Sequence, residues 1–530
     1  MQGGYLALLL HAHLPYVHHP EHARFLEENW LFEAITECYI PLLQRFERLR
    51  QERVAFRLTL SLSPTLIGML QDELLQQRYL QQLGRQIQLA TKEARRKHPD
   101  PRTQVMAAHY LQLFEETQHL YTSVYQQDLI GAFGRLQRSG QLELITTAAT
   151  HGFLPLLRTE PGSIRAQLEI ASETYQETFG RPSPGIWLPE CGYYRGLEAL
   201  LKEFGFRYFV LDTHGLLHAS ERPWLGIAAP IACPNGVAAF ARDPDSSRQV
   251  WSSQEGYPGD PWYREFHRDI GYERPAEQLA PLLPGDGSRA PTGIKYFRVT
   301  QQGEGKQPYE PNRAAERVQV HAVDFLKKRL QAFARLGSQM QRPPLLLAPY
   351  DAELFGHWWF EGPQWLEQLI RLSQQRPEIE LITPSEYLQR HPTLQSTQPS
   401  SSSWGAEGYN AYWLNEHNDW LYPHLHRAAR QMQAMAVDYA HEPPGTLRYR
   451  ALQQAARSLL LAQASDWPFM LKSGAGSTYA EQRIHDLLAR FHYLWKAIRE
   501  ETIEPLHLRA LEQLDAIFPH IDFRSFTPPE

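Results

Sequence analysis

Two carboxylates, Glu190 and Asp351, each come directly after a short apolar segment of the sequence. Glu190 lies between a proline and a cysteine-glycine pair that shape a sharp exit from its segment, and a nucleophilic carboxylate needs such a rigid position. Aromatic residues at 355 and 358–360 follow Asp351 and would raise the pKa of its carboxyl group by desolvation. One ionised and one protonated carboxyl group suit the cleavage of a glycosidic bond. We therefore predict Glu190 as the nucleophile and Asp351 as the general acid/base, with Glu353 as the rival acid.

Histidines form a second set of candidate residues. His11 and His13 follow an apolar segment at positions i and i+2, so they point to the same side if a strand continues through them. To hold a metal ion they would need a third ligand, for instance His151 or Asp212, and no spacing in the sequence shows that such a residue converges on them. We prefer the alternative, in which the histidines donate hydrogen bonds to sugar hydroxyls or to Glu190, and we predict no metal and no cofactor.

Aromatic side chains interleaved with polar ones predict surfaces for a carbohydrate. The tract 242–264 mixes Arg, Asp and Trp, up to Trp262 and Arg264, and such residues can stack on pyranose faces and clamp hydroxyls. The stretch 404–420 interleaves tryptophans and tyrosines with Asn, Glu and Asp, which a core helix would not normally carry, so we expect part of it to face a cleft. Farther on, Asp466 again sets a carboxylate beside an indole, although a helix-ending turn explains this motif equally well.

Short apolar runs of strand length recur between long amphipathic stretches, and polar residues follow each run closely. Strands that alternate with helical patterns indicate parallel strands joined by crossover helices. Chemistry just past the carboxyl ends of such strands favours an α/β barrel over a flat sheet. The predicted strands are residues 5–10, 54–60, 142–147, 185–188, 207–211, 344–348 and 379–382.

The composition changes along the chain and predicts its organisation. Helical spacing of Leu, Gln, Glu, Lys and Arg predicts a helical insertion after the second strand. The region 229–311, rich in Pro, Gly, Asp and aromatics, has little periodicity and is typical of a long functional loop. A Ser/Thr/Gln/Pro segment at 395–403 marks a boundary, and helical spacing resumes after it. We predict a catalytic barrel of residues 1–62 and 138–395, a helical insertion of 63–137, and a helical C-terminal domain of 396–530 that contributes to the active-site cleft.

Charge and cysteine content exclude several classes of protein. The chain of 530 residues has a formal net charge of -6, whereas nucleic-acid binders need clustered surplus Lys and Arg. Its 3 cysteines include no CxxC pair, which indicates neither a disulfide framework nor a zinc ribbon. No stretch approaches the roughly 20 apolar residues that span a bilayer. We expect a cytoplasmic monomer with a neutral or mildly polar substrate and with no nucleic-acid or membrane partner.

The segments described above resemble the sequence blocks of glycoside hydrolase family 57. The five blocks of that family are similar to residues 11–15, 150–155, 187–193, 348–358 and 404–419, in the family's order and over nearly the whole chain. The resemblance implies an α/β fold, namely an incomplete (β/α)7 barrel with a helical insertion and an all-helical C-terminal domain. It also implies a retaining mechanism in which Glu190 is the nucleophile, Asp351 is the acid/base and no metal takes part.

Within the family the sequence is most similar to the 1,4-α-glucan branching enzymes. This likeness implies that Trp262, Trp404, Trp413 and Asp466 contribute to substrate binding. The sequence departs from the subgroup in one respect, because those enzymes usually carry a tyrosine on a flexible loop over the site, and residues 220–235 contain none.

The expected reaction is therefore the cleavage of an α-1,4 linkage and transfer of the chain to a 6-hydroxyl, as in glycogen biosynthesis. An α-amylase or a 4-α-glucanotransferase of the same family is the alternative, since these enzymes differ only in the acceptor that reaches the intermediate. Outside the family, a metal-dependent polysaccharide deacetylase would use His11 and His13. A non-catalytic glucan-binding module would use the same aromatic residues but would need neither Glu190 nor Asp351.

Overall fold

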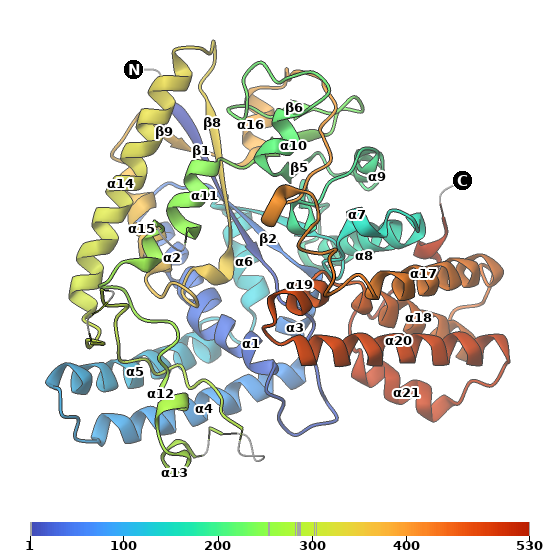
Figure 1. Cartoon of the computed structure of the whole chain (residues 1–530), viewed down its shortest axis with the longest axis horizontal. Helices are drawn as coiled ribbons and strands as arrows, with labels where there is room; N and C mark the ends of the chain where they lie inside the picture. Colours follow the sequence, from blue (N-terminus) through green and yellow to red (C-terminus); the bar gives the residue numbers. More distant parts are fainter. Residues whose placement is uncertain are drawn as a thin grey trace.

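The computed structural model describes residues 3–252, 255–280, 282–283, 288–301, 303 and 305–528. A strongly twisted sheet lies at the centre of the molecule, with helices around it and a group of helices from the C-terminal region at one side (Figure 1). The strands of this sheet are β1 (Gly4–Ala12), β2 (Leu58–Leu62), β3 (Leu142–Thr147), β4 (Gly185–Trp187), β5 (Tyr208–Leu211), β6 (Ile231–Ala232), β7 (Ala238–Ala241), β8 (Leu345–Asp351) and β9 (Ile379–Leu381).

The sheet curls into an incomplete barrel. Its strand order in the part described is β6-β7-β5-β4-β3-β2-β1-β8, with β9 beside β1, and the neighbours pair in parallel except for β6 and β7. The two distant strands β7 and β8 meet through an isolated parallel bridge between Arg242 and Leu347, where the amide of Asp243 donates to the Leu347 carbonyl at 2.7 Å. The predicted incomplete parallel barrel is confirmed.

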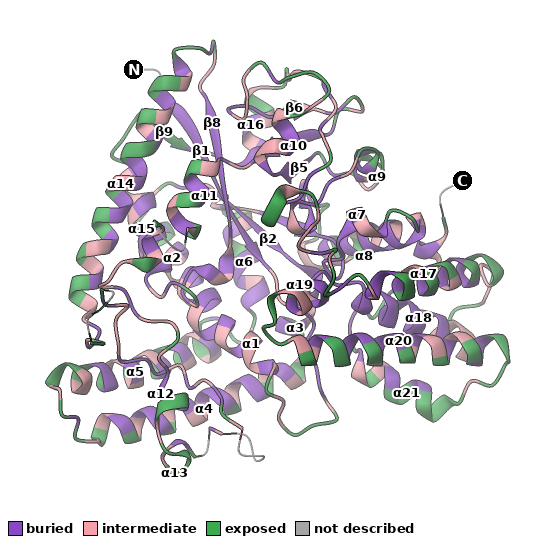
Figure 2. Cartoon of the chain, in the orientation of Figure 1, coloured by how far each residue is buried: buried purple, intermediate pink, exposed green. Residues whose placement is uncertain are grey.

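Alternation along β1 separates the interior of the barrel from its outer face. Tyr5, Ala7 and Leu9 pack in one buried cluster with residues of β4, β5, β7 and β8, whereas Leu6 and Leu8 pack in the cluster formed with the surrounding helices. Both faces of the strand are buried, which explains why its sequence is almost continuously apolar. Figure 2 shows the central strands as buried along most of their length. His11, the next residue in the odd-numbered series, therefore belongs to the interior face.

Two strands were not predicted from the sequence. β6 and β7 lie at the start of the region 229–311, which the low periodicity indicated to be a loop, and this interpretation was wrong for residues 231–241. Both strands are shorter than five residues and β7 contains three alanines, so neither has the length or the β-branched content that marks a strand. The same region contains the short helices α11 (Pro244–Trp251), α12 (Ile270–Glu273) and α13 (Ala276–Leu279).

Helices fill the segment that follows β2 and the region that follows β9. Asp72 and Asp100 accept hydrogen bonds from the first turns of α4 and α5, as N-terminal caps do. Between β2 and β3 lie α3 (Pro64–Gln71), α4 (Glu73–Arg95), α5 (Pro101–His119) and α6 (Leu129–Arg138). The C-terminal region consists of α17 (Leu421–Asp438), α18 (Leu447–Ala462), α19 (Asp466–Ser473), α20 (Ser477–Arg499) and α21 (Pro505–Leu514).

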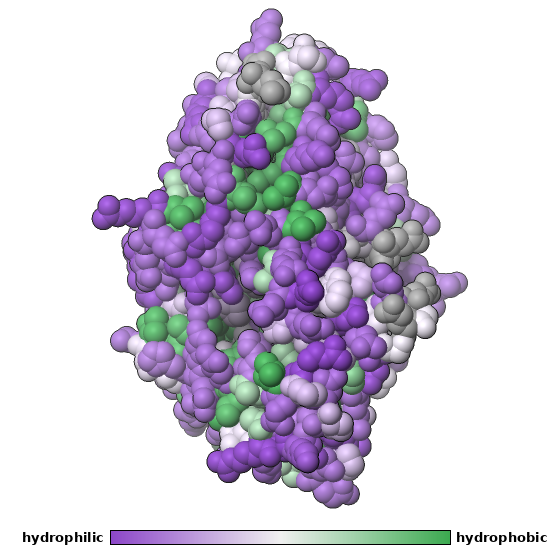
Figure 3. Space-filling model, turned by 90° about the vertical axis from the view of Figure 1, so that its left-hand side faces the viewer, coloured by the Kyte–Doolittle hydropathy of each residue, from purple (hydrophilic) through white to green (hydrophobic). Residues whose placement is uncertain are grey.

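The remaining helices pack around the barrel or follow its strands. They are α1 (Glu28–Ala34), α2 (Ile40–Gln51), α7 (Leu154–Leu157), α8 (Pro161–Phe179), α9 (Leu197–Glu203), α10 (Thr213–Leu217), α14 (Pro311–Gly337), α15 (Gly362–Ser373) and α16 (Pro384–Arg390). The face at the left of Figure 1 is mostly hydrophilic, with separate hydrophobic patches (Figure 3). Within the described residues, no helix combines the length and the apolar character needed to cross a membrane.

Candidate active site

The carboxyl ends of three neighbouring strands bring polar side chains together. His11 on β1 is in register with Ser61 on β2 and with Asp351 on β8. Residues in register on adjacent parallel strands point to the same face of the sheet, so these side chains share the interior face of the barrel. Along the strands, they come after the buried apolar cluster of the barrel interior, which includes Leu9 and Leu347. Strand register alone thus places a carboxyl, an imidazole and a hydroxyl at one end of the barrel.

A cavity of about 790 Å³ opens at this end of the barrel. The helical C-terminal region forms part of its wall, so residues far apart in the sequence face one another across it. Most of the residues predicted from the sequence line the cavity, namely His11, His13, His151, Glu190, Asp351, Trp404, Trp413 and Asp466.

Two of the predicted residues, Trp262 and Arg264, lie outside this lining. Arg264 is only 4% exposed, lies over the ring of Phe360 and is 3.6 Å from a carboxylate oxygen of Glu37, so its guanidinium is occupied within the protein. The ring of Trp262 is covered by the guanidinium of Arg298 at 4.3 Å. Both residues therefore lie away from the cavity, Arg264 buried and Trp262 half-buried, and their role in substrate binding stays a prediction. Alternating Arg, Asp and Trp also serve internal packing, and sequence pattern does not distinguish the two uses.

The backbone at Glu190 adopts a conformation that is rare for residues other than glycine. Glu190 and the next residue, Cys191, have positive φ values of 61° and 52°. The amide of Cys191 donates to the carbonyl of Leu188 at 2.9 Å, and the amide of Trp404 donates to the carbonyl of Glu190 at 2.8 Å. Strained backbone of this kind persists where surrounding contacts hold it, and it is concentrated at functional sites. The segment from the C-terminal region thus helps to hold the Glu190 turn.

The two carboxyl groups of the cavity have different surroundings. The carboxylate of Glu190 accepts a hydrogen bond from the indole of Trp404 at 2.6 Å and one from the hydroxyl of Ser465 at 3.0 Å. Burial raises the pKa of Glu190 to about 7, and these two hydrogen bonds oppose the rise. Burial also raises the pKa of Asp351 well above its usual range, and the nearby charges of Glu353 and Glu190 raise it further. Asp351 is therefore the better candidate to keep a proton, and Glu190 the better candidate to be ionised.

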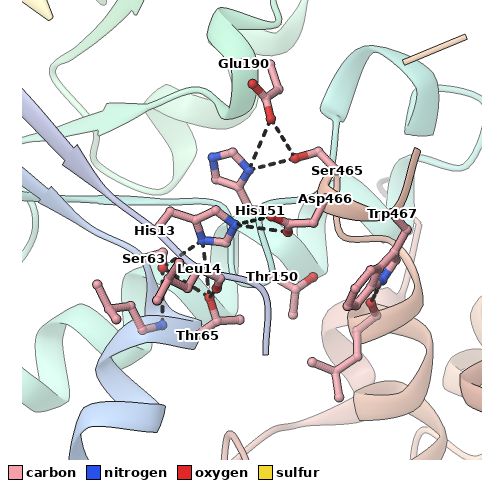
Figure 4. A network of polar contacts seen from close by, with 12 residues as sticks. His13, Leu14, Ser63, Thr65, Thr150, His151, Glu190, Ser465, Asp466 and Trp467 are labelled. Atoms are coloured by element: carbon pink, nitrogen blue, oxygen red, sulfur yellow. Dashed lines mark hydrogen bonds and ion pairs between the residues drawn. The ribbon is translucent and has the colours of Figure 1, made fainter. Parts of the chain in front are cut away.

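The three histidines of the cavity form one stacked group. The rings of His13 and His151 lie 4.0 Å apart, and Nε2 of His11 is 2.9 Å from Nε2 of His151. Figure 4 shows His13 paired with Asp466, where the shortest nitrogen to oxygen distance is 3.0 Å. Burial lowers the pKa of His13, but the charge of Asp466 and its hydrogen bond outweigh this effect, so the pKa is raised overall. His11 and His151 have lowered pKa values because of burial and the charge on His13. His13 is thus the member of the group that binds a proton most readily.

The two residues considered as a third metal ligand have other partners in the structure. Asp212, one of the two third ligands that we considered, pairs with Arg242 at 2.8 Å instead. The other, His151, makes its Nε2 contact with the ring of His11. Within the described ranges, no group of three His, Cys, Asp or Glu side chains is arranged to hold a metal ion.

Some residues in or next to the cavity were not assigned as site residues from the sequence, and Glu353 was considered there only as the rival acid. Ser465 precedes Asp466, but a serine before a helix normally indicates only a cap. Glu353 accepts hydrogen bonds from the hydroxyl of Tyr39 at 2.5 Å and from the amide of His13 at 3.2 Å. The cavity is also lined by Arg242, Trp251, Trp358, Tyr412 and Phe469. The high aromatic content near the strand ends was a sequence signal for the aromatic residues of the cavity. The sequence does not show, however, which aromatic side chains are exposed to it.

Comparison with known proteins identifies relatives of the whole chain. Residues 7–397 match the family model described as glycosyl hydrolase family 57, and residues 424–526 match the model described as 1,4-alpha-glucan branching enzyme, C-terminal. Among solved structures, the alpha-amylase AmyC of Thermotoga maritima is 42% identical, with a TM-score of 0.93 and coverage of 100% of both chains. The GH57-type branching enzyme of Pyrococcus horikoshii is 34% identical, with a TM-score of 0.89 over 99% of this chain and 98% of that one. A 1,4-alpha-glucan branching enzyme of Thermococcus kodakarensis is 33% identical over 97% of this chain and 76% of its own length.

Proposed function

We propose that this chain, which belongs to glycosyl hydrolase family 57, is a 1,4-α-glucan branching enzyme. The substrate is an α-1,4-glucan such as amylose, and the product carries a new α-1,6 branch. The observation that supports this proposal most is the position of the C-terminal region. The part that matches the branching enzyme C-terminal model contributes Asp466 to the wall of the same cavity that the barrel residues Glu190 and Asp351 line.

In the first step of the proposed mechanism Glu190 attacks the anomeric carbon of the bound glucan. Asp351, which keeps its proton because its pKa is raised, protonates the leaving glycosidic oxygen. The bond between the anomeric carbon and that oxygen breaks, and a covalent glycosyl-enzyme forms on Glu190. The hydrogen bonds from Trp404 and Ser465 hold the carboxylate in one orientation during the attack.

In the second step Asp351, now ionised, acts as a base. It takes the proton from the 6-hydroxyl of an acceptor glucan, whose oxygen attacks the anomeric carbon and releases Glu190. Because both displacements invert the anomeric carbon, the product retains the α configuration. If water is deprotonated instead, the same intermediate is hydrolysed, so the choice of acceptor decides between branching and hydrolysis.

Aromatic side chains around the cavity favour a glucan acceptor over water. The ring of Trp413 is almost fully buried and stacks on Phe153 at 4.9 Å. At the mouth of the cavity, Trp251 is 42% exposed and Trp358 is 53% exposed, and Trp358 stacks on Phe266 at 4.3 Å. Exposed indole rings offer flat surfaces for pyranose rings, and apolar walls limit the water that reaches the intermediate.

The decisive experiment is incubation of the purified protein with amylose, followed by proton NMR of α-1,6 linkages and by an assay of new reducing ends. A branching enzyme increases the α-1,6 signal and leaves few net reducing ends. If reducing ends rise and no α-1,6 signal appears, the protein is an amylase and the proposal is wrong. The variant Trp413→Ala should shift the balance toward reducing ends, because loss of this lining indole enlarges the cavity and admits water.

An α-amylase is the second candidate, and two observations favour it. The alpha-amylase AmyC of Thermotoga maritima is more similar to this chain than the two branching enzymes named above, at 42% identity. Residues 220–235 also contain no tyrosine, whereas branching enzymes of this kind usually place one over the site. Both candidates use the same two carboxyl groups, and the amylose experiment separates them by product.

Glu353 provides a prediction about pH dependence. Its negative charge is one cause of the raised pKa of Asp351, second to burial. In the variant Glu353→Gln the pKa of Asp351 should fall, so that Asp351 loses its proton at a lower pH. We therefore expect the alkaline limb of the kcat/KM profile to move down by roughly one pH unit. The matched control is Glu361→Gln, a buried carboxyl outside the cavity, which should leave the limb in place. An unmoved limb in Glu353→Gln would contradict the proposed coupling.

We further propose that the enzyme acts as a monomer in the cytoplasm and takes part in glycogen-type glucan synthesis. Its free cysteines, Cys38, Cys191 and Cys233, are buried thiols, which suits a reducing compartment. The proposed domain limits are residues 1–62 and 138–395 for the barrel, 63–137 for the insertion and 396–530 for the C-terminal domain. Light scattering during size-exclusion chromatography tests the monomer, and a mass near 61.3 kDa is expected.

A further inference from the structure

A continuous series of short contacts runs from β2 to the carboxylate of Glu190. The hydroxyl of Ser61 is 3.1 Å from Nδ1 of His11, and Nε2 of His11 is 2.9 Å from Nε2 of His151. Nδ1 of His151 is 2.8 Å from the hydroxyl of Ser465, which is 3.0 Å from Oε1 of Glu190. Figure 4 shows the last two of these contacts, with Ser465 between His151 and Glu190. His151 itself is 3.8 Å from Glu190, too far for a direct hydrogen bond, so Ser465 makes the connection.

The ionised carboxylate of Glu190, at one end of this series, fixes which atom donates in every hydrogen bond of the series. An ionised Glu190 only accepts, so Ser465 donates to it and accepts from Nδ1–H of His151. A neutral imidazole has one donor and one acceptor nitrogen, which makes Nε2 of His151 the acceptor from Nε2–H of His11. Nδ1 of His11 then accepts from the hydroxyl of Ser61. Burial and the charge on His13 lower the pKa values of His11 and His151, which keeps both rings neutral, as this order requires.

We infer that Ser465 is a positioning residue for Glu190, through which the C-terminal region orients and stabilises the nucleophile. Ser465 is 1% exposed and lies at the start of α19, and its amide donates to the carbonyl of His151 at 3.0 Å. It is therefore held by its backbone as well as by its side chain. The nucleophile of the barrel thus depends on a hydroxyl from another part of the chain, and the reaction needs the C-terminal region for more than substrate contacts. This inference rests on the proposed role of Glu190.

Other charged groups face Glu190 and must stay unchanged in a test of Ser465. The charge of Asp466 raises the pKa of Glu190 and the charge of His13 lowers it, after the larger effects of burial and of the bonds from Trp404 and Ser465. Asp351 faces the same cavity from β8. Replacing Ser465 removes one donor and leaves these charges in place.

The experiment compares pH profiles of kcat/KM on amylose for the full-length protein and its Ser465→Ala variant. Loss of the donated hydrogen bond destabilises the ionised carboxylate, so the pKa of Glu190 rises. The acidic limb should therefore move to higher pH by about one to two units, and the alkaline limb should stay in place. We also expect kcat at the optimum to fall by roughly 10- to 100-fold, because the carboxylate loses one of its two fixed contacts.

Three further variants separate positioning from folding. Ser465→Thr keeps the hydroxyl and should restore the acidic limb. Ser465→Cys nearly preserves the volume but donates weakly, so it should shift the limb even if the alanine variant does not fold. Ser458→Ala is the matched control, because this buried serine of α18 donates to the carbonyl of Gln454 and takes no part in the series of contacts that leads to Glu190.

The outcomes distinguish this inference from the proposed function. If Glu190→Gln is inactive and the acidic limb is the same in Ser465→Ala as in the wild type, the inference fails and the proposed function stands. An equal shift in Ser458→Ala would also overturn the inference, since the effect would then be structural. If Glu190→Gln stays active, the proposed role of Glu190 itself is wrong.

Discussion

The variant Glu190→Gln is expected to lose activity on amylose by a factor on the order of 10⁴ or more. Losses of this size are typical when a residue that takes part directly in the reaction is replaced. The amide has the shape of the carboxylate but is a poor nucleophile, so the first displacement fails. The left-handed turn at Glu190 is held by backbone hydrogen bonds, including one from the amide of Trp404, and these bonds do not depend on the side chain. The measurement is kcat from the rate at which α-1,6 linkages or reducing ends appear, alongside the thermal unfolding curve.

The smaller variant Glu190→Ala tests the role of nucleophile more directly. Azide can occupy the space of the missing carboxylate and attack the anomeric carbon in its place. We expect partial recovery of cleavage and a glycosyl azide of inverted, β configuration, which proton NMR identifies. The control is Glu198→Gln, a carboxyl group on α9 that accepts from the hydroxyl of Tyr193 and does not line the cavity. Activity of Glu190→Gln within tenfold of the wild type would show that another group is the nucleophile.

The variant Asp351→Asn is expected to lower kcat on amylose by about 10²- to 10⁴-fold, the usual contribution of a general acid/base. An asparagine cannot protonate the leaving oxygen or take the proton of the acceptor. The sign of the pH effect follows from the raised pKa of Asp351. The acid must be protonated, so wild-type activity falls as pH rises through that pKa, and this alkaline limb should be absent in the variant.

Substrates with good leaving groups separate the two roles of Asp351. An α-maltosyl fluoride needs no protonation of its leaving group, so Asp351→Asn should still form the glycosyl-enzyme and then stall. A rapid release of fluoride equal to the enzyme concentration, followed by slow turnover, is the expected result. Mass spectrometry of the stalled protein should find the added sugar on Glu190. An alkaline limb that persists in Asp351→Asn would assign the acid to another group, with Glu353 as the first alternative.

Much of the barrel could be predicted from sequence periodicity. β1 reads as an apolar run because both of its faces are buried, and β3 and β8 have the same character. Polar residues directly after these runs had to lie at one end of the barrel, because parallel strands end at the same edge. This reasoning places Asp351 near His11, and the register of β1 and β8 confirms their proximity. β7 escaped prediction because four small or aromatic residues carry no periodic signal of their own.

Residue type alone was a poor guide to the exposure of side chains in the loops. Trp262 and Arg264 come from the same kind of tract as Arg242 and Trp251, yet the first pair lies outside the cavity, under cation–π contacts, and the second pair lines it. An arginine beside an indole forms the same contact with a buried ring as with an accessible one. Only the path of the loop between β7 and α14 decides which of them a substrate can reach.

The barrel class, the helical regions and the position of two carboxyl groups after strands could be predicted from the amino-acid sequence, since these depend on local periodicity and on the geometry of parallel strands. By contrast, the contacts of Ser465 and Trp404 with the two carboxylate oxygens of Glu190 arise only in the folded chain, because both residues lie more than 200 positions beyond Glu190. The fold also sets which histidine binds a proton most readily, because Asp466 contacts His13 and thereby raises its pKa. Such contacts join segments that are remote in sequence, and a single chain has no local pattern that encodes the distance between them.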